Sequence, residues 1–132
     1  MAAIREAVDT NRRLAQDNPA RFAPDLALSL NNLSIRLSDA GDGAGALAAI
    51  GEAVETYRRL AQDNPARFAP DLASSLNTLS NRLNDARDNA GALAAIREAV
   101  EIRRRLAQDN PARFASDLAR SVRPLERLEK SG

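Results

Sequence analysis

A ten-residue segment, LAQDNPARFA, occurs three times in this chain, at residues 14–23, 60–69 and 106–115. The copies stand 46 residues apart, and residues 2–47 match residues 48–93 at 37 of 46 positions. The same register continues from residue 94 through Ala119 and then decays. A fixed period of this kind is the signature of repeat architectures, in which each unit buries its apolar face against its neighbours. We therefore expect a stack of similar units.

Each unit contains two stretches with helical periodicity. The first stretch carries leucines on one helical face, at residues 26, 30, 33 and 37 and again at 72, 76, 79 and 83. The second is rich in alanine, with Ala46, Ile50, Ala53 and Val54 on a wide apolar face. We expect Leu33 and Leu79 to be buried. The predicted helices are 2–16, 24–39, 43–62, 70–85, 89–108 and 116–129.

Turn and capping residues separate these stretches. Asp42 and Asp88 stand where the N-cap of the alanine-rich helices belongs. Asn64-Pro65 is expected to end the helix before it, because proline biases its predecessor away from helical geometry. Pro24 and Pro70 suit the first turn of the next helix, where a missing N–H costs little. The repeated segment is thus a joint between units, and its phenylalanine, at 22, 68 and 114, is expected to plug the space between them.

Composition excludes several classes of function. The 132 residues include no cysteine and no histidine, which removes disulfides, thiolate nucleophiles, imidazole bases and two common metal ligands. The net charge of +1 argues against nucleic acid as a partner. We find neither a run of about 20 apolar residues that would span a membrane nor a signal peptide, so a cytoplasmic location is expected. No enzymatic activity, metal or cofactor is predicted.

Small residues interrupt the apolar faces at regular places and carry a family resemblance. One unit has Leu30, Leu33, Ser34 and Leu37 followed by Ala46, Ile50 and Ala53, and the next unit has Leu76, Leu79, Ser80 and Leu83 followed by Ala92, Ile96 and Ala99. This pattern resembles the tetratricopeptide repeat, and LNNLS at 30–34 and LNTLS at 76–80 resemble the longer repeats of kinesin light chains and bacterial relatives. HEAT repeats, whose period is about 40 to 47 residues, are the alternative.

The resemblance implies an all-α fold, a right-handed superhelical α-solenoid of antiparallel helix pairs. We expect one domain over residues 1–132. It would comprise a half-repeat at 2–23, repeats at 24–69 and 70–115, and a divergent capping helix at 116–132.

Positions that differ between units are free of the shared packing requirement. Several cluster opposite the leucines, and the resemblance places this face in a concave groove that binds an extended peptide or partner protein. The candidate residues are Leu28, Asn31, Ile35, Ser38, Ser74, Asn77, Asn81 and Asn84. Asparagine can donate to and accept from a peptide backbone. The alternative explanation is drift of an exposed face after duplication.

The two ends of the chain depart from the repeat. Ile4, Val8 and Leu14 lie on a helix with no preceding partner, so we expect this edge to mediate self-association into a homo-oligomer; a fragment of a longer protein is the alternative. An engineered or recently amplified self-assembling repeat is the second functional hypothesis. At the other end Pro124 should kink or stop the last helix near Arg123, and Glu126 and Glu129 replace a small residue and a leucine.

Charged residues at helical spacing have a simpler interpretation. Glu55 with Arg58 and Arg59, and Glu101 with Arg104 and Arg105, are expected to form solvated pairs within their own helices. Tyr57, the only tyrosine, is expected to fill a local gap.

Overall fold

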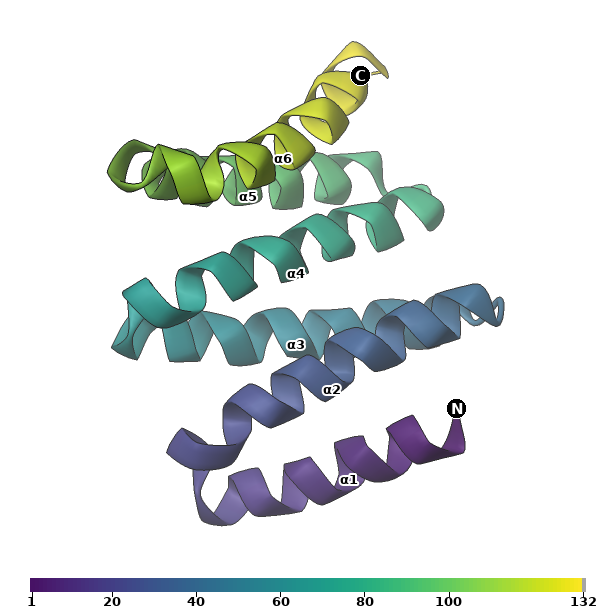
Figure 1. Ribbon diagram of the computed structural model, residues 1–132. Helices are drawn as coiled ribbons and strands as arrows, with labels where there is room; N and C mark the ends of the chain where they lie inside the picture. Colours follow the sequence, from purple (N-terminus) through teal and green to yellow (C-terminus); the bar gives the residue numbers. More distant parts are fainter. Residues whose placement is uncertain (132) are drawn as a thin grey trace.

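The structure, a computed structural model, describes residues 1–131 and consists of helices joined by very short connections (Figure 1). No strand occurs within this range. Gly132, the last residue of the expected capping segment, lies outside the described residues. The helices are α1 (Ala2–Asp17), α2 (Pro19–Asp39), α3 (Gly43–Asp63), α4 (Pro65–Asp85), α5 (Asn89–Asp109) and α6 (Pro111–Ser131).

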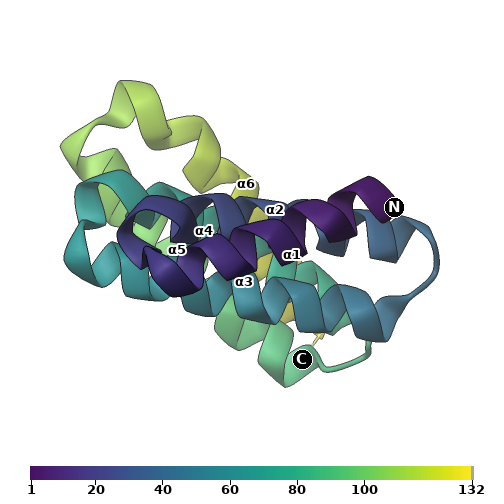
Figure 2. The same ribbon diagram turned by 90° about the horizontal axis from the view of Figure 1, so that it is seen from below.

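The helices form two layers. The leucine-rich helices α2, α4 and α6 make one layer, which we call the A layer, and α1, α3 and α5 make the B layer (Figures 1 and 2). Each helix packs mainly against the helices directly before and after it in the chain. The result is the expected all-α solenoid, in which successive units stack along one axis.

Aspartate caps determine the turns between α2 and α3 and between α4 and α5, as predicted. The backbone N–H of Gly45 donates to Asp42 Oδ1 and that of Gly91 to Asp88 Oδ1, both at 2.9 Å. A Cβ on Gly91 would lie 2.6 Å from the Asp88 carboxylate, so a larger residue there would push the capping side chain aside. Gly41 has a φ of 84°, and Arg87, its counterpart, takes the same left-handed conformation at 64°.

The joints differ from the prediction, because the A-layer helices begin five residues earlier than expected. Helices α2, α4 and α6 start at Pro19, Pro65 and Pro111, leaving one non-helical asparagine after each B-layer helix. That asparagine is the N-cap: Asn64 Oδ1 accepts the Arg67 N–H at 3.3 Å, and the same bond recurs at the other two joints. Proline is favoured at the first helical position. Pro24 and Pro70 therefore lie inside their helices.

Small residues bring the two layers together where the pattern predicted it. Ser34 and Ser80 are almost fully buried, and their hydroxyls donate to the carbonyl oxygens of Ala46 and Ala92 at 2.7 Å. Leu33 is buried, as predicted. Leu79 is only half-buried, so its prediction was wrong; this side chain lies at the boundary between the two core clusters and packs against both.

The phenylalanines of the joints pack into the stack. Phe68 and Phe114 are buried, as expected of plugs between units, whereas Phe22 is half-buried. The arginine before each phenylalanine lies over its ring, with the guanidinium carbon 4.7 to 5.1 Å from the ring centroid. Each joint therefore combines an apolar plug with a cation–π contact.

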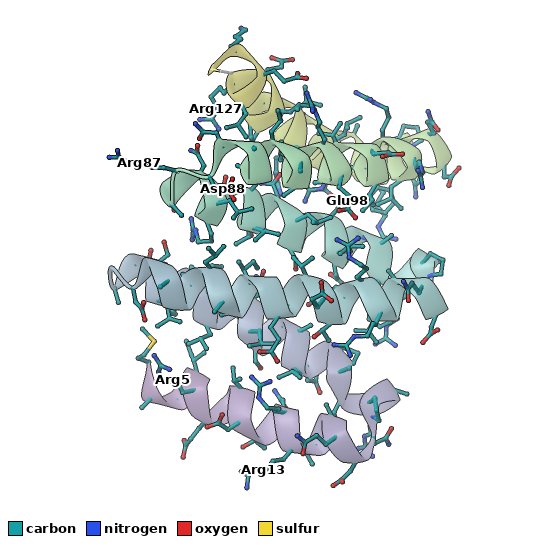
Figure 3. All side chains as sticks on the ribbon, turned by 180° about the vertical axis from the view of Figure 1, so that it is seen from behind. Arg5, Arg13, Arg87, Asp88, Glu98 and Arg127 are labelled. Atoms are coloured by element: carbon teal, nitrogen blue, oxygen red, sulfur yellow. The ribbon has the colours of Figure 1, made fainter. Side chains whose placement is uncertain are left out.

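Ion pairs connect consecutive B-layer helices, which the sequence did not predict. Arg58 on α3 contacts Glu98 on α5 through two hydrogen bonds of 2.6 and 3.1 Å, and Arg12 on α1 contacts Glu52 on α3 in the same manner. Figure 3 shows Glu98 from the B-layer side. Arg58 therefore hydrogen-bonds to the next B-layer helix rather than within α3, although the charge of Glu55 in its own helix also helps to raise the pKa of its guanidinium. The pair of Glu101 with Arg105, at 2.6 Å, is confirmed.

Helix α6 does not stop at Pro124 but continues to Ser131. In Figure 1 its second half rises more steeply than α2 and α4. Glu126 is exposed, and Glu129 lies 3.5 Å from Arg97 of α5. These two glutamates thus lie at the surface or in a salt bridge.

Candidate partner-binding surface

The eight predicted groove residues lie on the A layer, on the side of α2 and α4 opposite their leucines. We call this set the A stripe: Leu28, Asn31, Ile35 and Ser38 on α2, and Ser74, Asn77, Asn81 and Asn84 on α4. Residues seven apart on a helix differ by only about 20° in direction, so each helix presents its members as one stripe. Asn31, Ser38 and Asn77 are half-buried, and the remainder are exposed. No member of the A stripe is charged.

The α2 part of the A stripe is apolar. Leu28 and Ile35 expose 54% and 40% of their surface. Ile35 also lines a cleft of about 420 Å³ between α1 and α2, together with Ala3 and Ile4. The corresponding residues of α4 are Ser74 and Asn81, and α4 forms the same helix in the same layer. Packing therefore does not require an apolar residue at either position.

The α4 part of the A stripe is polar and partly engaged within the protein. Ser74 Oγ accepts a hydrogen bond from Arg103 Nη2 at 3.1 Å. Asn77 Oδ1 accepts one from the Ser121 hydroxyl at 2.9 Å, which ties α4 to α6. Asn81 and Asn84 instead line an open cleft of about 400 Å³ between α4 and α6. Ser74 and Asn77 thus also serve the fold, while Asn81 and Asn84 face free space.

Arg103 is the residue that sequence reasoning missed. It is 6% exposed, and its guanidinium donates to the Asp117 carbonyl oxygen at 3.1 Å and to Ser121 Oγ at 2.6 Å. Burial lowers the pKa of Arg103; the Asp117 carboxylate opposes this shift, and the neighbouring Arg120 adds to it. All three of its hydrogen-bond acceptors are neutral oxygens.

Comparison of the repeat units gives a sequence signal for the position of Arg103. Residue 103 corresponds to Asn11 and Tyr57, and all three face the A-layer helix that follows. Asn11 Nδ2 donates to Ser29 Oγ at 2.9 Å, and Tyr57 is buried at 6% exposure, as expected of a residue that fills a gap. Burial, with a smaller contribution from Asp71, raises the pKa of Tyr57 to about 12. A position that varies between units yet stays at least partly buried is a packing site that several different side chains can fill.

The expected self-association edge is only partly open. Val8 is buried at 4% exposure, and Ile4 packs against the same core cluster, so α2 covers both. Leu14 alone among the three is exposed, at 37%. Val8 therefore cannot belong to an exposed edge, because α2 packs against α1.

A cleft of about 780 Å³ lies at the first joint, between α1, α3 and the start of α2. Arg12, Glu52 and Thr56 line it, and no residue of the A stripe does. Across residues 1–131 no three His, Cys, Asp or Glu side chains come together as a metal site would require. Over the same range no helix is long and apolar enough to cross a membrane.

Comparison with known proteins identifies the repeat. A family model described as tetratricopeptide repeat matches residues 26–66 and again residues 72–112. The two matches begin 46 residues apart, as the internal repeat requires, and together cover more than half of the chain. A search of curated proteins found no match. The narrower resemblance to kinesin light chains stays a prediction. The two-layer helical stack, its small-residue contacts and the repeated match together show that the chain belongs to the tetratricopeptide repeat family.

Proposed function

We propose that this protein is an interaction module that holds an extended segment of a partner protein along the A stripe. Tetratricopeptide repeats are generally protein–protein interaction modules. The observation that carries the proposal for these residues is the exposed apolar pair, Leu28 and Ile35, in a chain whose units are otherwise nearly identical.

The chemistry of the A stripe suits an extended peptide. Exposed asparagines such as Asn81 and Asn84 offer both a donor and an acceptor to the N–H and C=O groups of a passing backbone. Leu28 and Ile35 offer an apolar surface to its side chains, and burial of apolar area contributes roughly 25 cal/mol per Å². Together they can bind a backbone and still select for apolar side chains at one end.

The test begins with selection of random 12-residue peptides displayed on phage against the whole protein. Selected peptides are then titrated against a double variant, Leu28→Ser with Ile35→Asn. This variant gives α2 the residues that α4 already carries at Ser74 and Asn81, so the fold should tolerate it. We expect binding to weaken at least about tenfold, a difference of roughly 1.4 kcal/mol.

A matched control replaces two residues outside the A stripe with the residues at the corresponding positions of the next repeat unit. Asp9→Glu with Gly43→Asn imports the residues found at Glu55 and Asn89, and binding should stay unchanged. Equal affinity of both double variants for every selected peptide would remove the A stripe as the binding site.

Self-association through α1 is the second candidate, with another copy of this chain as the occupant. The observation that favours it is that Ala3 and Ala7 are exposed on α1, whereas their counterparts Ala49 and Ala53 are buried on α3. Sedimentation velocity over a wide concentration range tests it. Association that Leu14→Ser weakens would support this candidate, and a monomer at all concentrations would refute it.

A further inference from the structure

The A stripe has a third copy on α6, and that copy is cationic. Arg120, Arg123, Arg127 and Lys130 occupy the positions of Leu28, Asn31, Ile35 and Ser38, and all four are exposed. Because α2, α4 and α6 follow one another along the A layer (Figure 1), the chemistry changes in one direction. It begins apolar on α2, becomes hydroxyl and amide on α4, and ends positively charged on α6.

Nearby acidic residues offset only part of this charge. Asp117 Oδ1 lies 3.5 Å from Arg120, whose side chain is 75% exposed. Glu126 shares a cleft of about 460 Å³ with Arg123, Arg127 and Lys130. Glu129 faces Arg97 of α5 at 3.5 Å. Leaving Arg127 aside, three cations (Arg120, Arg123 and Lys130) lie beside two carboxylates (Asp117 and Glu126), and this face stays net positive.

Arg103 extends the positive charge toward α4. Its Nη2 reaches Ser74 Oγ of the A stripe at 3.1 Å, and its Nη1 reaches Ser121 Oγ of α6 at 2.6 Å. The guanidinium thus lies beneath the seam between α4 and α6 with no carboxylate hydrogen-bonded to it. A negatively charged group on that seam would be attracted by Arg103 as well as by the exposed side chains of α6.

We propose, on the basis of the binding role above, that the partner segment has two chemically different ends. Apolar side chains lie over Leu28 and Ile35, an uncharged middle crosses α4, and aspartate or glutamate side chains lie over Arg120, Arg123 and Lys130. This order fixes the direction of the segment along the A layer, because either end placed on the wrong helix would lose its partner.

A peptide fits this surface better than a nucleic acid does. A polyanion needs cations along its whole track, yet none of the eight A-stripe residues on α2 and α4 is charged. The net charge of the chain is only +1. An extended peptide of 12 residues spans roughly 40 Å and can change its chemistry along its length.

The experiment uses the peptides selected above and a triple variant, Arg120→Ser, Arg123→Asn and Lys130→Asn. These substitutions copy Ser74, Asn77 and Asn84 of α4 onto α6, and retention of the helical circular-dichroism spectrum and melting temperature checks the fold. Selected peptides should carry acidic residues near one end and apolar residues near the other. The triple variant should bind them at least about tenfold more weakly and with less dependence on salt, whereas the Leu28→Ser and Ile35→Asn variant should keep the salt dependence.

A spin label tests direction. Placed at the apolar end of a selected peptide, it should broaden the amide signals of Leu28 and Ile35 and leave those of Arg123 and Lys130 sharp. Broadening on α6 instead would overturn the proposed order.

The outcomes separate this inference from the proposed function. Peptides that need Leu28 and Ile35 but show no acidic bias, and bind the triple variant equally well, would overturn the inference alone. If no peptide is enriched on the protein beyond its enrichment on the support without protein, both the inference and the proposed function are overturned. If a 20-residue single-stranded oligothymidylate binds more tightly than any selected peptide, the ligand of this surface is a nucleic acid rather than a peptide, and the inference is overturned.

Discussion

One residue position, occupied by Asn11, Tyr57 and Arg103 in successive units, shows how a repeat adjusts its packing locally. Asn11 reaches Ser29 of the following helix by a hydrogen bond, and Arg103 reaches the corresponding Ser121. Tyr57 occupies the same space with a buried ring. The surrounding fold stays the same because each side chain either fills the gap or satisfies the polar groups around it.

Tyr57 gives this position a property that can be measured. Its folded-state pKa of about 12 lies above the ordinary value of 10.0, so the neutral phenol stabilises the fold fully below pH 10. That contribution is lost as pH rises from 10 toward 12, because the unfolded chain releases its proton first. Since the chain has one tyrosine and no tryptophan, absorbance at 295 nm reports Tyr57 alone; we expect a midpoint near 12 natively and near 10 in urea.

The variant Tyr57→Phe provides the control. The two proteins share every other titratable group, so only the difference between their melting temperatures belongs to the phenol. A native midpoint at 10 would show that the ring is accessible to solvent.

At the scale of the element, sequence reasoning located every helix but misplaced the start of each A-layer helix. The caps Asp42 and Asp88 were recognised because a single aspartate at the expected position is enough to predict an N-cap. Asn64-Pro65 was interpreted only as a stop signal, although the same two residues also cap and begin α4. Arg103 was missed for a related reason: an arginine on an alanine-rich helix resembles a solvated charge until Ser74 and Ser121 are placed around it in space.

The dual role of the joint asparagine predicts the effect of a substitution. Asn64→Ala removes the acceptor for the Arg67 N–H, and loss of an N-cap costs about 0.5–2 kcal/mol of unfolding free energy. Gln62→Ala, two residues earlier on an exposed site, should change it by less than about 0.5 kcal/mol. Urea unfolding measures both. Equal midpoints for the two variants would mean that proline alone starts α4.

At the scale of the whole molecule, each helix contacts mainly the helices next to it along the stack. The largest separations in sequence among the described ion pairs are those of Arg12 with Glu52 and Arg58 with Glu98, which connect one B-layer helix to the next. Nothing in such an arrangement directly couples α1 to α6 (Figure 1). Stability should therefore vary along the stack, with the terminal helices opening more easily than the central ones.

Hydrogen exchange followed by mass spectrometry tests this expectation. Val8 is the one buried residue among those of α1, whereas α3 buries seven of its residues. We expect amides of α1 to exchange fastest, those of α6 next, and those of α3 and α4 slowest. Uniform protection would instead indicate a single cooperative unit. The same measurement at low and high protein concentration also addresses self-association: protection of α1 that rises with concentration would show that another copy covers its exposed face, since dilution cannot alter contacts within one chain.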